Sequence, residues 1–372
     1  MDKRDLLFGL HETEGIGWKS IDKVCKAGFL RENALSCRLE EWEAFGFTAK
    51  VSNQLAANYS VEWIAARRDQ MKSNGVAMLT VLDADYPELL KETAQPPWVL
   101  YYRGNLDLLS GPAIAMVGTR VPTAYGRKVG AMLAEELSSA GFTVVSGLAR
   151  GIDSVCHEAA LSKRGKTIAV VATGLDQVYP AENRELERLI AKEGLVITEY
   201  PLGTKSHPGL FPQRNRIIAG LTLGTVVVEA DVRSGSLITA DAALEAGRDI
   251  FAVPGPVTSP KSRGALDLIK QGAKLITCGA DVMEEYISLL PKNQAEHGIE
   301  GSLAAPAGEG YTEKKLTSEE SRLYHILHQG PFTLDELLVR AEWDFGHLHS
   351  VLLSLIIKKV VTQLPGAIYK VI

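Results

Sequence analysis

The chain has 372 residues and a formal net charge of −5, and 46% of its residues are hydrophobic and 23% charged. This length suggests two or three domains of about 100 to 200 residues each, and this composition excludes a fibrous or wholly disordered chain. The negative charge argues against a broad cationic surface, although residues 101 to 290 carry 20 Lys and Arg against 20 Asp and Glu, which is compatible with a local basic patch.

The amino-terminal part, residues 1 to 75, is predicted to form a helical domain of the SAM or helix-hairpin-helix type. Its apolar run ends at His11 and Glu12, so we expect neither a signal peptide nor membrane insertion. The tripeptide Gly15-Ile16-Gly17 fits a helix-hairpin-helix turn, whose backbone amides can contact a DNA phosphate, and it equally fits a plain helix break.

Residues 76 to 109 are expected to form a connector with a strand at 76 to 82. From 110 to 290 short β-branched runs alternate with amphipathic stretches, a pattern that predicts a Rossmann-like α/β core with a mostly parallel sheet. The helix after the first core strand should end at Ala140-Gly141, where glycine supplies the carboxyl-terminal cap. The predicted core strands are 113–117, 142–146, 167–172, 195–198, 225–230, 249–253 and 273–277.

The carboxyl-terminal part begins with residues 291 to 317, whose Gly, Ala, Pro and charged residues lack apolar periodicity and indicate a flexible linker. Residues 318 to 372 contain three helical segments followed by two short strands, which predicts a winged helix. Its third helix has no Arg or Lys before Lys358, whereas a reader of the DNA major groove needs polar or basic side chains there. We therefore expect this domain to contact protein or to regulate.

The cysteines are few and far apart in the sequence. They form no C-x-x-C pair, which argues against structural zinc and against disulfide bonds. This spacing indicates a reducing, cytoplasmic compartment. The four residues are Cys25, Cys37, Cys156 and Cys278.

Loops that follow the strands of a parallel sheet hold its ligands, because helix amino termini expose unpaired N–H groups there. In the loop after residue 117, Gly118 allows a close backbone approach, Thr119 offers a hydroxyl group and Arg120 a cation. A tight turn with a solvated arginine is the alternative interpretation. In the next such loop, Asp153 with His157 could form an acid/base pair, although a helix cap beside a packed histidine is the more ordinary reading.

The segment 203 to 221 combines cations with an aromatic ring at the start of a predicted helix. This combination is typical of sites that bind single-stranded nucleic acid. In the alternative interpretation the ring is buried and the arginines are solvated. Tyr179, in the loop before it, is either a lid or a stacking ring. The candidate residues of this segment are Lys205, His207, Phe211, Gln213, Arg214, Asn215 and Arg216.

Two further loops suit an anion. Gly235 and Ser236, together with Ser234 and Thr239, lie at a predicted helix start, and Lys261 and Arg263 lie on a Pro/Gly-rich loop. The sequence contains no P-loop, no H-E-x-x-H motif and no G-x-S-x-G motif. We therefore predict neither catalytic residues nor a metal site nor a cofactor.

Several of these motifs, in this order, closely resemble the DNA-processing protein A family, also called DprA or Smf, over about residues 100 to 290. The resemblance implies a cytoplasmic, homodimeric bacterial protein that binds incoming single-stranded DNA. It also implies that the protein loads the RecA recombinase past single-strand-binding protein during natural transformation and recombination, and that it works with other competence proteins. Such proteins are mediators and not enzymes. The motifs are PPWVLYYRG, VGTR, SGLARGID, TGLDQVYP, FPQRNRIIAGL, EADVRSGSLITA and FAVPGPV.

The resemblance places the DNA contacts on Arg120, Phe211 and the run 213 to 215, with either Lys205 or His207 at a phosphate and the loop at Gly235 and Ser236 as a neighbour. The rival interpretation is a nucleotide-processing enzyme resembling the phosphoribohydrolases, which carry a P-G-G-x-G-T motif. The corresponding stretch here, 232 to 237, lacks the double glycine, so we favour the mediator.

Overall fold

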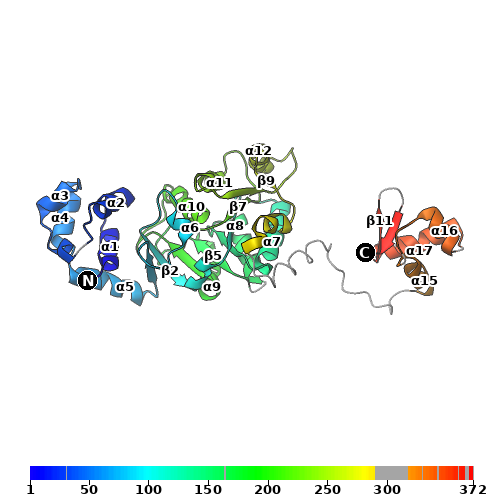
Figure 1. Cartoon of the computed structure of the whole chain (residues 1–372), viewed down its shortest axis with the longest axis horizontal. Coiled ribbons are helices and arrows are strands. Elements are labelled where there is room, and N and C mark those ends of the chain that lie inside the picture. Colours follow the sequence, from blue (N-terminus) through cyan, green and yellow to red (C-terminus); the bar gives the residue numbers. More distant parts are fainter. Residues whose placement is uncertain are drawn as a thin grey trace. The chain divides into compact units, whose positions relative to one another are not determined.

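The computed structural model describes residues 1–30, 32–162, 165–289, 317–328, 330–341, 343–358, 360–364 and 368–371 (Figure 1). The chain divides into two compact units, Met1–Ser302 and Leu303–Ile372. No helix within the described ranges is long and apolar enough to cross a membrane. The predicted linker at 291 to 317 lies, except for Thr317, outside the described residues.

The first unit is built around a nine-stranded sheet in the order β1-β2-β6-β5-β4-β3-β7-β8-β9. From β6 to β9 all neighbouring strands are parallel, which confirms the predicted mostly parallel α/β core. The strands are β1 (Ala77–Thr80), β2 (Val99–Gly104), β3 (Ala113–Val117), β4 (Thr143–Ser146), β5 (Thr167–Val170), β6 (Leu195–Thr198), β7 (Gly224–Val227), β8 (Asp249–Ala252) and β9 (Lys274–Leu275).

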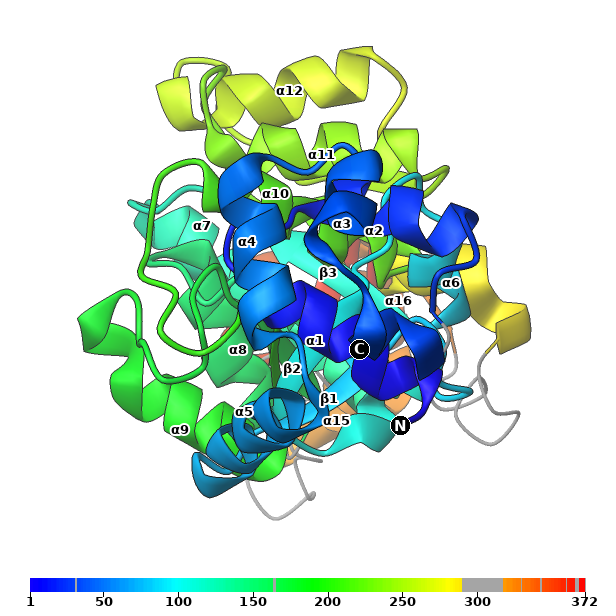
Figure 2. The same ribbon diagram turned by 90° about the vertical axis from the view of Figure 1, so that its left-hand side faces the viewer.

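Helices cover both faces of this sheet (Figure 2). In β3, Ile114 and Met116 pack against α7 and α8, whereas Ala115 and Val117 share a core with α10 and α11. This alternation follows from the two-residue period of a strand, and it explains why the core strands are apolar on both sides. The helices are α7 (Ala124–Ser139), α8 (Ile152–Ser162), α9 (Arg184–Glu193), α10 (Leu210–Gly220), α11 (Gly235–Glu245), α12 (Arg263–Lys270) and α13 (Ala280–Met283).

The end of α7 shows how the sequence sets one boundary. The helix stops at Ser139, Ala140 forms its cap, and Gly141 follows with a φ of 95°. This left-handed conformation costs glycine little because it has no Cβ atom. The predicted end of this helix is therefore confirmed.

The segment 76 to 109, predicted to be a connector with a strand at 76 to 82, adds two strands to the same sheet, and β1 lies within the predicted strand. β2 pairs antiparallel with β6, and β1 pairs antiparallel with β2. Val99 and Tyr101 of β2 are buried in one core with residues of the amino-terminal helices. Without β1 and β2, the apolar edge of β6 would be open to water. The segment is therefore a part of the sheet. The segment also holds the short helix α6 (Glu88–Lys91).

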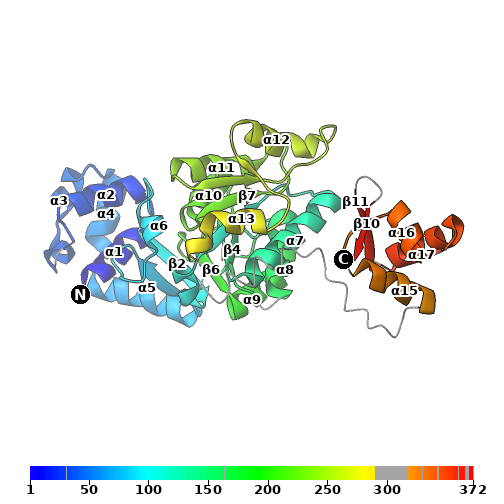
Figure 3. The same ribbon diagram turned by 45° about the vertical axis from the view of Figure 1, so that its right-hand side comes forward.

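The amino-terminal part is helical, as predicted, and packs on this edge (Figure 3). Trp18 stacks on Trp98 with ring centroids 5.5 Å apart and donates a hydrogen bond from Nε1 to the Pro96 carbonyl. The hydroxyl of Tyr101 donates to Glu12, which also pairs with Arg67. The helices are α1 (Lys3–Glu12), α2 (Trp18–Lys26), α3 (Leu39–Ala44), α4 (Ala49–Asn58) and α5 (Val61–Ser73).

The second unit has the helix and strand order of a winged helix. Within the described residues of this unit, three helices enclose an apolar core together with a three-stranded antiparallel sheet in the order β10-β12-β11. Thr333 caps α16 by accepting a hydrogen bond from the Glu336 N–H. The elements are α15 (Ser318–Leu327), β10 (Phe332–Thr333), α16 (Leu334–Ala341), α17 (Phe345–Ile357), β11 (Val361–Leu364) and β12 (Ile368–Val371).

Candidate nucleic-acid interface

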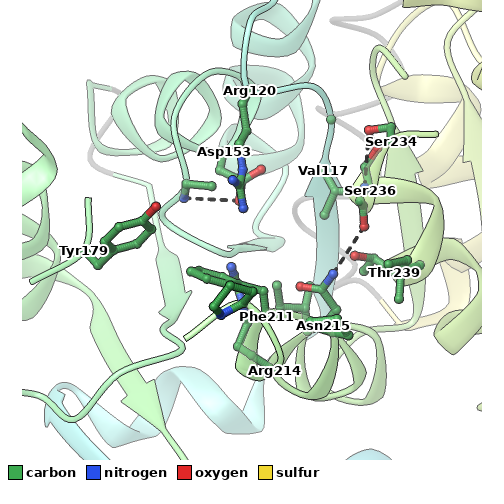
Figure 4. A pocket seen from close by; sticks show the side chains of 17 residues that line it. Val117, Arg120, Asp153, Tyr179, Phe211, Arg214, Asn215, Ser234, Ser236 and Thr239 are labelled. Atoms are coloured by element: carbon green, nitrogen blue, oxygen red, sulfur yellow. Dashed lines mark hydrogen bonds between the residues drawn. The ribbon is translucent and has the colours of Figure 1, made fainter. Parts of the chain in front are cut away.

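The strand order reverses at β3, which lies between β4 and β7. In open α/β sheets a crevice forms at such a reversal, beyond the carboxyl ends of the strands. A cavity of about 500 Å³ lies at this place (Figure 4). Its wall is made by the end of β3, by the loops after β3, β4 and β5, by α10 and by the start of α11.

One wall of the cavity is aromatic and cationic. The Arg120 guanidinium lies 5.4 Å from the centroid of the Phe211 ring, and the Tyr179 ring lies 5.5 Å from the same ring. Arg120 and Tyr179 are exposed, and Phe211 is half-buried. A cation beside two accessible rings can hold a phosphate and stack a base in one place.

The backbone of the loop after β3 aims Arg120 at this wall. The Thr119 N–H donates to the Glu229 carbonyl at 2.7 Å, and the Thr119 carbonyl accepts from Ile152 N–H at 3.2 Å. A Cβ atom on Gly118 would lie 2.6 Å from the Ile152 side chain, so glycine is needed for this close approach. The loop is thus fixed at its base, and Arg120 projects from it.

The facing wall carries neutral polar groups. The Asn215 amide donates to the Gly235 carbonyl at 3.3 Å, and the Ser234 and Ser236 hydroxyls lie 2.7 Å apart. Thr239 lies one turn further along α11 and also lines the cavity. Ser234 is the N-cap of α11, so these hydroxyls surround the start of a helix.

Arg214 and Asp153 lie at the base of the cavity and are 4% and 7% exposed. The Arg214 Nη1 donates to the Val170 carbonyl at 3.0 Å, and the Asp153 carboxylate accepts from the N–H groups of Gly147 and Ala149. Burial lowers the pKa of Arg214 to about 10, against the opposite effect of the Asp153 charge. Burial likewise raises the pKa of Asp153, which the Arg214 charge opposes.

Arg214 is therefore a cation held mainly by the protein, and only its edge meets the cavity. A Cβ atom on Gly147 would lie 1.4 Å from the Arg214 Nη1, so this glycine is what admits the guanidinium under the β4 loop. Asp153 lies within α8, and its carboxylate accepts from N–H groups of the preceding loop, so it caps that loop and not, as expected, the start of the helix. His157 is fully buried beside Thr167 and does not contact the cavity.

The structure brings half of the proposed contact residues together and leaves the other half outside the cavity. Gly118, Arg120, Phe211, Arg214, Asn215, Gly235 and Ser236 line it. Thr119, Lys205, His207, Gln213, Arg216, Lys261 and Arg263 do not.

Several residues of the second group have structural partners. Arg216 pairs with Glu199 and donates to the Gln95 carbonyl at 2.6 Å, so it ties α10 to the segment before β2. Lys261 donates from Nζ to the Val121 carbonyl and joins two loops.

Four other members of this group have exposed side chains outside the cavity lining. Lys205 and His207 are exposed on the loop that ends in the cavity residue Pro208. Gln213 is exposed and accepts a hydrogen bond from the Tyr200 hydroxyl at 3.3 Å. Arg263 is exposed at the start of α12, outside the cavity lining.

Tyr179, Ser234 and Thr239 also line the cavity, although they were not predicted to be DNA contacts. Tyr179 follows β5 by several residues, and loop sequences alone do not say which side chains turn inward. Ser234 and Thr239 precede and follow the selected Gly235-Ser236 pair on α11. A one-turn helical period from Ser236 would have found Thr239.

Comparisons with known proteins agree with this architecture. The family model of the DNA recombination-mediator protein A matches residues 77–287, and the DprA winged helix domain matches 308–367. The protein Smf of Synechocystis is 34% identical over 96% of this chain and 96% of its own length.

Two solved structures are also similar. The X-ray structure of DNA processing protein A from Streptococcus pneumoniae covers 77% of this chain and 99% of its own, with 37% identity and a TM-score of 0.66. A structure that concerns the single-stranded DNA binding mode of DNA processing protein A from Helicobacter pylori covers 58% and 97%, with 30% identity and a TM-score of 0.53.

Proposed function

This chain belongs to the DNA-processing protein A (DprA/Smf) family, and on that premise we propose that it binds single-stranded DNA in the cavity beside β3 and loads the RecA recombinase onto that DNA. Its setting would be natural transformation and homologous recombination in the cytoplasm, where it acts on strands covered by single-strand-binding protein and alongside other competence proteins. The proposed role is that of a mediator, without a catalytic step.

The observation that carries this proposal is the cavity wall formed by Arg120, Phe211 and Tyr179. Aromatic rings stack on every base, and a nearby cation holds the backbone, so such a wall binds single strands with little sequence preference. In duplex DNA the bases are stacked inside the helix and cannot reach these rings without unpairing. The wall therefore favours single strands over duplex.

The same face has exposed cations outside the cavity. Lys205 and His207 lie on the loop that reaches the rim at Pro208. A strand that leaves the cavity would pass this loop, and we propose that these two side chains contact its phosphates. Phosphate contacts of this kind set affinity and salt dependence, not sequence preference.

We further propose that the protein forms a homodimer through the edge of the sheet at β9. β9 is the last strand of the described sheet, and Leu275 on it is 46% exposed. Leu244, at the end of α11, is 59% exposed. An edge strand beside exposed apolar side chains is a surface that proteins normally cover, and a second copy would do so.

The experiment that tests the proposal is fluorescence anisotropy of the full chain with single-stranded and duplex oligonucleotides over a series of salt concentrations. We expect tight single-strand binding that weakens as salt rises, because each neutralised phosphate releases counterions. Arg120→Glu should weaken it, whereas Arg188→Glu, a change at a residue 82% exposed on α9, should not. Equal affinity for duplex, or equal loss in both variants, would contradict the proposal.

Recombinase loading is tested separately. The chain is added to single strands coated with single-strand-binding protein, and RecA filament formation is followed through its ATP hydrolysis. We expect the lag to shorten with the unmodified chain and not with Arg120→Glu. A lag that is unchanged by the unmodified chain would overturn the mediator role while leaving DNA binding intact.

A further inference from the structure

Arg150, in the loop after β4, is a cation beside the aromatic wall that was not predicted to be a DNA contact. It lines a small hollow next to the cavity, together with Arg120 and Tyr179, although it does not line the cavity itself. The loops that carry the two arginines touch, because a Cβ atom on Gly151 would lie 2.4 Å from the Thr119 carbonyl oxygen. A strand that leaves the cavity past Tyr179 therefore meets Arg150 next.

In the free protein this cation is paired with a carboxylate from the loop after β5. The Arg150 Nε and Nη2 donate to the two Glu182 carboxylate oxygens at 2.5 and 2.6 Å. Both side chains are in contact with water, since they are 60% and 52% exposed. A fork of two parallel hydrogen bonds is also the geometry in which arginine binds a phosphate. Glu182 thus occupies the two donors that a phosphate would use.

The two loops are also held together without this ion pair. The neighbouring Asn183 donates from Nδ2 to the Leu148 carbonyl at 2.8 Å and to the Ser154 hydroxyl at 2.9 Å, and these hydrogen bonds are partly buried. An exposed ion pair adds little to stability, because water and salt screen the two charges. The pair of Arg150 and Glu182 can therefore open while the surrounding loops stay in place.

Arg120 differs from Arg150 in its partners. It lies beside the same rings, and within the part of the chain that the structure describes no carboxylate is paired with it. Glu182, in contrast, opposes a phosphate in two ways, because it occupies the donors of Arg150 and because its charge repels the backbone of the strand. One of the two exposed cations beside the rings is therefore available at once, and the other only after its carboxylate has left.

We propose that Arg150 is a further phosphate-binding residue and that Glu182 competes with the DNA for it. A phosphate of the strand takes the place of the Glu182 carboxylate on the Arg150 guanidinium, and the released carboxylate turns to water. When the strand leaves, Glu182 pairs with Arg150 again, so the pair shortens the time for which DNA stays bound. This inference rests on the proposed function, because it requires that a single strand lies against the rings.

The test compares variants that remove one charge each. Anisotropy of the full chain with a labelled oligothymidylate over a salt series measures the affinity and its salt slope. Glu182→Gln should tighten binding about two- to fivefold, the range expected for release of an exposed ion pair, without reducing the salt slope. Arg150→Gln should weaken binding and reduce the slope by about 0.7, the value for one phosphate contact on a single strand.

Glu185→Gln is the matched control. It removes the same charge from a side chain that is 82% exposed in the first turn of α9, close in sequence to Glu182. The DNA affinity of this variant should equal that of the unmodified chain. Urea unfolding checks the fold of Glu182→Gln, whose midpoint should be unchanged because Asn183 still joins the two loops.

The direction of the Glu182→Gln effect decides between the outcomes. Tighter binding in Glu182→Gln but not in Glu185→Gln, with weaker binding in Arg150→Gln, supports the proposal. Weaker binding in both Glu182→Gln and Arg150→Gln would mean that the pair only holds the loops together, and this result overturns the proposal. Unchanged binding in both, or equal tightening in the two glutamate variants, overturns it as well.

These results are distinguishable from a failure of the proposed function. In each of them the unmodified chain still binds single strands and Arg120→Glu still weakens that binding, so the proposed function stands. An unmodified chain that binds no single strands would overturn both.

Discussion

The stacking role of Phe211 gives the sharpest prediction, made with Phe211→Ala. Stacking of a base on an aromatic side chain contributes about 1 to 3 kcal/mol, so its loss should weaken single-strand binding about 5- to 150-fold. The ring is half-buried and lies beside Arg120, 5.4 Å away, so a smaller loss of the cation–π contact adds to this effect. The free energy of unfolding should change little, because the ring does not belong to the buried core.

Anisotropy over a salt series measures this effect and identifies its cause. Phe211→Ala removes no charge, so the dissociation constant should rise while the slope of its logarithm against the logarithm of salt stays unchanged. Phe345→Ala is the control, because Phe345 is 58% exposed in the winged-helix unit. An unchanged dissociation constant, or a changed salt slope, would refute the stacking argument.

Three further predictions concern charge, packing and pH. Arg120→Gln should reduce the salt slope by about 0.7, the value for one phosphate contact on a single strand, and an unchanged slope would place the contact elsewhere. Gly147→Ala should lower the free energy of unfolding by about 2 kcal/mol or more, because the added Cβ displaces the buried Arg214 guanidinium. Gly235→Ala should leave the free energy of unfolding nearly unchanged, and urea unfolding of both variants measures the difference. Burial lowers the pKa of His157 to about 3 and that of His11 to about 4, below the usual 6.5. The unfolded chain therefore binds protons first as the pH falls below 6.5, and stability should decrease down to about pH 4, with a smaller decrease in His157→Gln; equal decreases in the two chains would contradict this.

Much of the fold could be predicted from the sequence, because it depends on local patterns. Seven apolar, β-branched runs coincide with β3 to β9 within a few residues at each end, since strands buried on both faces must be apolar throughout. The glycine after α7 marked the end of that helix for the same local reason. The predicted strand at 76 to 82 contains β1, whereas β2 was predicted only as part of a connector, because its place between β1 and β6 depends on partners from other parts of the chain.

The candidate site was predicted only as a set of loops. The rule that ligands bind at the carboxyl ends of parallel strands selected the loops around Gly118, Phe211 and Gly235, and the structure brings these three positions to one cavity. Sequence could not rank the residues inside each loop, because accessibility depends on what packs against them.

Three arginines show what could be predicted from the sequence and what depends on the tertiary structure. Arg120, Arg214 and Arg216 were equivalent as sequence letters near strand ends, and each was selected as a DNA contact. In the structure Arg120 projects into the cavity, Arg214 is buried under Gly147, and Arg216 is paired with Glu199. The sequence by itself determined the strands, the helices and the loops that meet at the cavity. The tertiary structure decided which of the three cations is accessible to a ligand, because partners such as Glu199 and the Val170 carbonyl come from distant parts of the chain.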